Sequence, residues 1–183
     1  MVKPVNYLTN SLTGLGGEAG VFYDYIMAGN GLYLRANNHQ LAVTVCIAAQ
    51  KIRGLAPLKE EIQLLHGKIP LYFLNLALSI LCIKPDIEQY LAVTWQGNYS
   101  LNVPSQIQTA VSVTYETSPG TVLDIHSHVG GVPACFSSID DHDEQGLCLY
   151  AVVGDLRNLC PTIDLRLGIY GYFIPLEKED IFV

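Results

Sequence analysis

The chain has 183 residues, of which 50% are apolar and 15% are charged, and it carries a formal net charge of -7 with a pI near 5.0. This length suits one domain with a full hydrophobic core, and the high apolar content excludes extensive disorder. The negative charge, with no cluster of lysine and arginine, argues against binding to nucleic acid. The most apolar stretch, Ile69 to Ile83, is shorter than the roughly 20 residues that span a membrane, and no apolar signal region begins the chain, so a cytoplasmic protein is expected.

Patterns typical of strands dominate the first part of the chain. Residues 20–37 contain two β-prone runs on either side of a Gly-Asn-Gly turn, and Asn-Gly is a strong signal for a hairpin. Residues 39–50 predict another strand. Residues 52–70 predict a loop that leads to a short amphiphilic segment.

Two helices are predicted. The first is expected over residues 71–83, between Pro70 and Pro85, and its leucine content indicates that it is buried on most sides. A shorter helix is expected from Ser137, because serine and aspartate side chains at a helix N-terminus satisfy free amides and meet the positive end of the dipole.

The second part of the chain is otherwise strand-like and ends in a charged tail. Its predicted strands lie within residues 89–104, which contain a second Gly-Asn hairpin signal, and within residues 110–116, 120–128, 147–156 and 163–176. These strands together predict a central sheet.

Two histidines, His126 and His128, stand one residue apart at the end of a predicted strand. Side chains two residues apart on a strand share one face, so the imidazoles converge, and Asp140 in the following helix can fold back toward them. Two histidines, one carboxylate and an open water position form a catalytic zinc site. On the spacing alone, two solvated or hydrogen-bonded histidines at a strand end are the more common explanation.

The residues around this pair resemble the zinc signature of the JAB/MPN (JAMM) metalloprotease family, which is His-x-His, about seven residues, then Ser-x-x-Asp. Here His126-Ser127-His128 is followed by eight residues and then by Ser137-Ser138-Ile139-Asp140. The alternative alignment, with Ser138 and Asp141, lengthens the gap further. The flanking segments LDIHSHV, FSSIDDHDEQG, YAVVGDL and RLGIYGYF are similar to the bacterial branch of the family that includes the PRTRC system protein A.

The resemblance is strongest over residues 120–174 and implies a fold. It implies an α/β (α+β) fold with a single JAB/MPN-like domain over residues 1–183. In this fold a mixed sheet is flanked by helices, and the shape is related to that of the zinc deaminases. An inserted hairpin at about residues 90–116 is expected, because the chain is longer than compact members of the family.

The resemblance also implies roles for individual residues. His126, His128 and Asp140 bind zinc, with Asp141 as the alternative to Asp140, and the zinc activates a water molecule for amide hydrolysis. Ser137 donates a hydrogen bond to the oxyanion. From its position alone, Ser137 is equally well explained as the N-cap of the helix, a role that Ser138 can take instead.

A general base is the remaining requirement, and in the family it is a glutamate on an earlier strand. Asp24 occupies the corresponding place in the first hairpin and ranks first, ahead of Glu116 and Glu18, each of which is also explained as a solvated surface carboxylate. His142 is expected to be a solvated helix residue or to orient Asp140.

The sequence therefore predicts a zinc-dependent metallopeptidase or isopeptidase-like hydrolase. A flexible peptide or the C-terminal tail of a ubiquitin-like protein is the expected partner, bound by strand addition. The alternative is a catalytically inactive protein of the same fold that binds metal or acts as a scaffold.

Overall fold

A computed structural model describes residues 3–109, 113–116, 118–129 and 131–183. The chain forms two compact units, residues 1–67 and residues 68–183. This differs from the single domain that the sequence analysis expects. The physical reason is the strand pairing. In each sheet found among the described residues, all the strands belong to the same unit.

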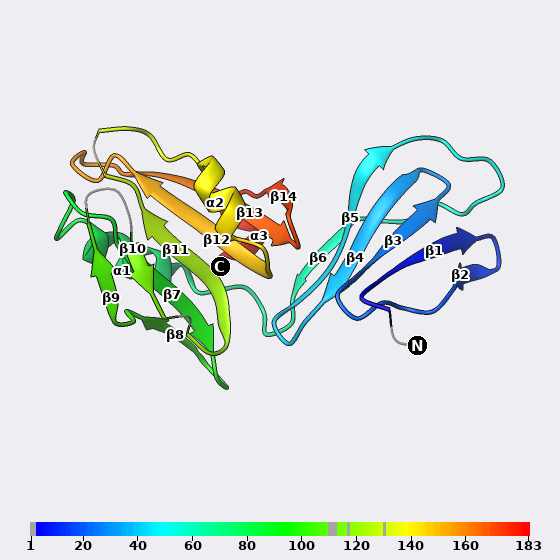
Figure 1. Cartoon of the computed structure of the whole chain (residues 1–183), viewed down its shortest axis with the longest axis horizontal. Helices are drawn as coiled ribbons and strands as arrows, with labels where there is room; N and C mark the ends of the chain where they lie inside the picture. Colours follow the sequence, from blue (N-terminus) through cyan, green and yellow to red (C-terminus); the bar gives the residue numbers. More distant parts are fainter. Residues whose placement is uncertain (1–2, 110–112, 117, 130) are drawn as a thin grey trace. The chain divides into compact units, whose positions relative to one another are not determined.

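Unit 1 is a sheet of six strands in the order β2-β1-β3-β4-β5-β6 (Figure 1). The strands are β1 (Val5–Ser11), β2 (Gly14–Gly16), β3 (Tyr23–Ala28), β4 (Gly31–Asn37), β5 (Leu41–Ala49) and β6 (Glu61–Leu64). The hairpin predicted around the Gly-Asn-Gly turn is confirmed as β3 and β4, which pair antiparallel from Tyr23↔Ala36 to Ala28↔Gly31. A cluster of buried apolar side chains, Leu8, Ile26, Ala28 and Tyr33, fixes the three central strands on one another.

Unit 2 is built on a second six-stranded sheet, in the order β14-β13-β12-β11-β7-β8, with a separate pair β9-β10. Its strands are β7 (Tyr90–Trp95), β8 (Tyr99–Asn102), β9 (Gln106–Gln108), β10 (Val113–Tyr115), β11 (Thr121–Ser127), β12 (Leu147–Gly154), β13 (Thr162–Ile169) and β14 (Tyr172–Pro175). The helices are α1 (Leu71–Leu81), α2 (Ser138–Asp143) and α3 (Lys178–Ile181). The sheet is mixed, since β11 and β12 pair parallel and the other neighbours pair antiparallel.

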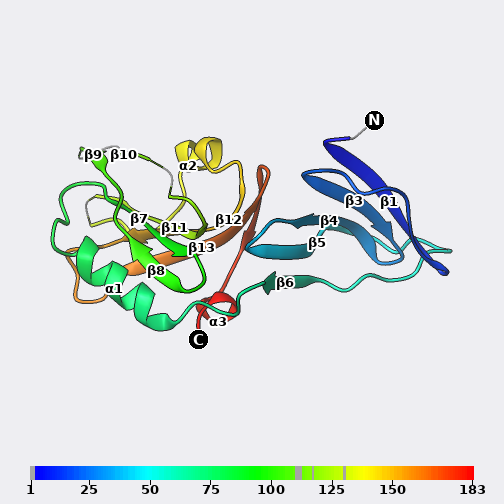
Figure 2. The ribbon, with the colours of Figure 1, turned by 90° about the horizontal axis from the view of Figure 1, so that it is seen from below.

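The helices of unit 2 lie on both faces of this sheet. Figures 1 and 2 show α2 over one face, above β11 and β12, and α1 over the opposite face near β8. The chain is thus a mixed α and β protein that consists mostly of strands.

Helix α1 begins directly after Pro70, as predicted, and ends at Leu81. Its burial is narrower than expected, because Leu74, Ala77 and Leu81 alone are buried in it while Tyr72 is 64% exposed. These three residues follow the spacing of one helical stripe, so α1 covers the sheet with a single face. None of the helices in the described part of the chain has the length and hydrophobicity that crossing a bilayer requires.

Strand β7 belongs to the main sheet, which changes the position of the expected insertion. Residues 90–94 are all buried, and β7 pairs with β11 on one side and with β8 on the other. A strand that is buried on both faces reads as a continuous apolar run, which is what the sequence has here. The segment outside the main sheet is therefore the β9-β10 pair, and not the whole of residues 90–116.

The core beneath β11 is expected to be a main source of stability. Ile125 is 0% exposed, so Ile125→Ala should lower the free energy of unfolding by about 2–5 kcal/mol in a urea titration followed by circular dichroism. Ile107→Ala is the matched control, because Ile107 is 75% exposed and its loss should change the free energy by less than about 0.5 kcal/mol. Equal effects of the two substitutions would contradict the packing described here.

Candidate metal centre

The two histidines lie at the end of strand β11, in the unit 2 sheet. His126 lies opposite Tyr90 of β7 and Val152 of β12, and it is buried. His128 follows the end of the strand, and its N–H donates to the Val153 carbonyl oxygen at 2.9 Å. The backbone is thus fixed on both sides, and the two imidazoles project from one face of the sheet, as the spacing predicts.

Helix α2 brings the carboxylate, and its first turn fixes the orientation of that group. Ser137 is the N-cap: its hydroxyl oxygen accepts from the Asp140 N–H at 3.3 Å, and its own N–H donates to Asp140 Oδ2 at 2.6 Å. This reciprocal capping box holds the Asp140 side chain against the helix end and leaves Oδ1 free to face the histidines. Of the two serines that the sequence offers as the N-cap, Ser137 is the one that caps α2.

Side-chain atoms of the three predicted metal-binding residues meet at this point. His126 Nε2 lies 3.2 Å from His128 Nε2 and 3.2 Å from Asp140 Oδ1, and His128 Nε2 lies 3.5 Å from Asp140 Oδ2. A tetrahedral ion with bonds of about 2.0–2.1 Å requires ligand atoms about 3.3 Å apart. The two distances from His126 Nε2 are close to this value, and the three residues form a cluster of the kind that holds a metal ion.

The alternative ligand, Asp141, is used elsewhere. Its carboxylate accepts from Arg166 Nη1 at 2.5 Å, so the structure brings Asp140 and not Asp141 to the histidines. His142 is exposed on α2 and does not belong to the cluster formed by His126, His128 and Asp140.

The charges within this cluster support one another. Burial acts to lower the pKa of His126, but the hydrogen bond and the negative charge of Asp140 outweigh it, so the pKa is raised. Burial acts in the opposite sense on Asp140, where hydrogen bonds from the two histidines hold the pKa of the carboxyl well below its usual range. Asp140 is thus a carboxylate at neutral pH, which is the form that binds a cation.

A second carboxylate, Glu88, lies at the site and escapes the sequence analysis. Glu88 lies two residues before β7, and the next residue, Gln89, forms two hydrogen bonds with Ser127. The Ser127 N–H donates to the Gln89 carbonyl oxygen at 2.9 Å, and the Gln89 N–H donates to Ser127 Oγ at 3.1 Å. Since Ser127 stands between the two histidines, these bonds place Glu88 beside them. Burial, with a smaller contribution from the charge of Asp140, raises the pKa of Glu88.

These groups share one cavity of about 190 Å³. Its polar lining comes from Glu88, His126, His128, Ser137, Asp140, Asp143 and Glu144, and its apolar lining from Val113, Tyr115 and Ile139. Two of the apolar walls belong to β10, so the β9-β10 pair forms one side of the metal centre. No donor among the described residues hydrogen-bonds to the Glu88 carboxylate, which leaves it available to a bound molecule.

Of the three carboxylates expected to act as base, two belong to unit 1 and one belongs to unit 2. Asp24 is buried in unit 1, where it forms an ion pair with Arg35 at 2.8 Å and accepts from the Gly20 N–H at 2.6 Å. Glu18 and Glu116 are exposed. Glu116, which belongs to unit 2, does not line the cavity that contains the histidines. A local sequence match selects Asp24, whereas the pairing of β7 with β11, which no local pattern reveals, brings Glu88 to the site.

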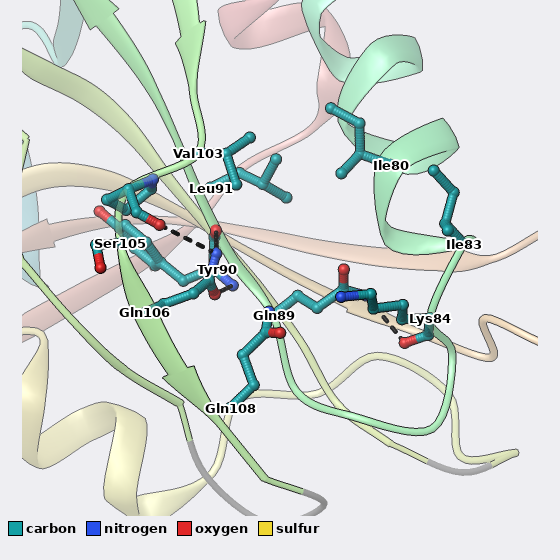
Figure 3. A pocket seen from close by; sticks show the side chains of 11 residues that line it. Ile80, Ile83, Lys84, Gln89, Tyr90, Leu91, Val103, Ser105, Gln106 and Gln108 are labelled. Carbon is teal, nitrogen blue, oxygen red and sulfur yellow. Dashed lines mark hydrogen bonds between the residues drawn. The ribbon is translucent and has the colours of Figure 1, made fainter.

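A larger cavity, of about 450 Å³, lies between the end of α1 and the segment before β9 (Figure 3). Ile80, Ile83, Leu91 and Val103 line it together with Gln89 and Gln106. The Gln106 side chain pairs with the backbone of Tyr90, accepting from its N–H at 2.8 Å and donating to its carbonyl oxygen at 3.0 Å. This cavity contains no histidine, cysteine or carboxylate, so the chemistry of the protein points to the smaller one.

In comparisons with known proteins, no family model matches the chain and no curated protein matches it significantly. Evidence for the function therefore comes from the geometry of the site.

The capping box generates a stability prediction. Ser137→Ala removes the acceptor of the Asp140 N–H and should lower the free energy of unfolding by about 0.5–2 kcal/mol in a urea titration. Ser138→Ala makes the same chemical change one residue later, where the side chain is exposed, and should have a smaller effect. The reverse order would show that Ser138 is the N-cap.

Proposed function

We propose that the protein is a zinc-dependent hydrolase that cleaves amide bonds, a metallopeptidase or isopeptidase of the JAB/MPN type. The observation that supports this most strongly is one cavity lined by three residues that can bind a metal, the ligand triangle of His126, His128 and Asp140, together with the carboxylate of Glu88. A structural metal site would have its fourth position filled by the protein, and a triangle with an adjacent base is the arrangement of a catalytic one.

The ligand types favour zinc among the common divalent ions. Imidazole nitrogens are preferred by zinc, copper, iron and nickel, whereas calcium and magnesium prefer sites made of oxygen atoms. His126, His128 and Asp140 would hold the ion. When bound, zinc lowers the pKa of its water ligand to about 7 and polarises a substrate carbonyl.

The chain supplies the proton transfers and part of the charge stabilisation. The Glu88 carboxylate accepts the proton of the attacking water and returns it to the leaving amine. Its raised pKa suits this exchange, because a base is most effective when its pKa approaches the working pH. The Ser137 oxygen accepts from the Asp140 N–H, so its hydroxyl hydrogen remains free to donate to the developing oxyanion.

The shape of the site favours a flexible substrate. A cavity of about 190 Å³ accommodates a peptide group and a small neighbouring side chain, but not a folded domain. Val113 and Tyr115 at its wall provide apolar contacts for an extended chain. The resemblance to the JAB/MPN family points to the same class of partner, an unstructured peptide or the C-terminal tail of a ubiquitin-like protein.

Zinc binding is the first test. The parent protein, incubated with zinc and desalted, should contain about one zinc ion per chain by elemental analysis, and His126→Ala/His128→Ala should contain almost none. His142→Ala is the matched control, since it removes an exposed histidine of the same region and should leave the zinc content unchanged. Zinc retained by the double variant would contradict the site.

The base assignment is tested by turnover. Glu88→Gln should retain zinc but lower the rate of cleavage of a ubiquitin-like fusion or a peptide library by about 10²–10⁴-fold. Glu116→Gln, an exposed acid outside the cavity, is the control and should be fully active. Loss of activity in Asp24→Asn, together with full activity in Glu88→Gln, would show that Asp24 is the base.

Zinc binding without turnover in the parent protein would favour the alternative function, that of an inactive protein that binds metal.

A further inference from the structure

Behind the metal centre lies a buried group of charges that the proposed chemistry does not use. It consists of Glu144, which follows α2, and Arg166, which lies in β13 and is 6% exposed. Burying a guanidinium and a carboxylate is costly unless each is paired. Their contacts therefore indicate what this group does.

Arg166 is held on all sides. Its Nε and Nη2 donate to Glu144 Oε2 at 2.9 and 2.7 Å, and its Nη1 donates to Asp141 Oδ1 at 2.5 Å. Its guanidinium carbon lies 3.7 Å from the centre of the Phe136 ring and 3.8 Å from the centre of the Phe173 ring. The planar guanidinium has two aromatic rings stacked against it and two acids along its edge. These contacts fix the orientation of the Arg166 side chain.

This arrangement ties α2 to the sheet. Phe136 directly precedes the N-cap Ser137, Asp141 lies in the first turn, and Glu144 follows the last turn. A single side chain from β13 thus contacts the segment before the helix, the helix itself and the residue after it. Asp140 is carried by this helix, so its distance from the histidines depends on Arg166.

Glu144 also reaches the metal centre directly. Its second oxygen, Oε1, is not used by Arg166 and lies 3.8 Å from His126 Nδ1. His126 Nε2 faces His128 and Asp140, so Nδ1 is the nitrogen on the side away from the ligand triangle. A metal-binding histidine commonly points its other ring nitrogen at a carboxylate, which fixes both the ring orientation and the nitrogen that carries hydrogen.

We propose that Glu144 is a positioning residue that orients the His126 ring with Nε2 toward the metal, and that Arg166 holds Glu144 in place for this role. The inference rests on the proposed function, because it assumes that His126 binds a metal ion. It assigns to Glu144 and Arg166 a role in metal affinity that is separate from the stability of the fold.

The test is zinc affinity, measured on the full chain by competition with a chromophoric chelator and with zinc as the probe. Glu144→Gln, which keeps the size of the side chain, should weaken zinc binding by about 10–100-fold. Asp141→Asn is the matched control: it removes the other acid that pairs with Arg166 but does not reach His126, and its effect should be less than about 3-fold. Urea unfolding of the metal-free proteins separates this loss from a general destabilisation.

A spectroscopic readout distinguishes orientation from packing. In long-range ¹H–¹⁵N spectra of the zinc-loaded parent, His126 should show hydrogen on Nδ1 and metal on Nε2, and Glu144→Gln should weaken or broaden this signature. Arg166→Lys should lower zinc affinity as Glu144→Gln does, and the double variant should show little further loss.

Equal zinc affinity in Glu144→Gln and the parent, with an unchanged imidazole spectrum, would overturn the positioning role while leaving the zinc site standing. Additive losses in the double variant would show that Arg166 does not act through Glu144. A parent protein without zinc would overturn both this inference and the proposed function.

Discussion

The antiparallel pairing of β7 with β11 is the constraint on which the site depends. It sets Tyr90 opposite His126, and the hydrogen bonds between Gln89 and Ser127 extend the same register by one residue. Side chains alternate between the faces of a strand, so this register places Glu88 on the same face as the two histidines. A slip of one residue would turn Glu88 away from them and leave the ligand triangle without its proposed base.

The other half of the site depends on a helix of six residues, too short to be stable by its own hydrogen bonds. The capping box between Ser137 and Asp140 starts the helix, and contacts with the sheet hold it in place. The carboxylate that closes the capping box is also the one that faces the histidines. One aspartate therefore links the local stability of α2 to the geometry of the metal centre.

Local patterns in the sequence predict the parts of the structure that local forces determine. The β3-β4 hairpin, the start of α1 after Pro70, and the convergence of His126 and His128 all follow from turn chemistry and strand periodicity. Glu88 could not be found in this way, because only the sheet order places β7 beside β11. Local patterns do not reveal long-range strand pairing. For this reason the sequence predicts neither the division into two units near residue 67 nor the place of β7 in the main sheet.

X-ray absorption spectroscopy of the zinc-loaded protein would examine the metal centre itself. The account predicts four light ligands at about 2.0–2.1 Å, with the multiple-scattering signature of two imidazoles and no sulfur. None of the five cysteines belongs to the ligand cluster found among the described residues, so a sulfur ligand would be an informative alternative. A zinc–sulfur distance of about 2.3 Å, or a six-coordinate shell of oxygen atoms alone, would contradict the site built from His126, His128 and Asp140.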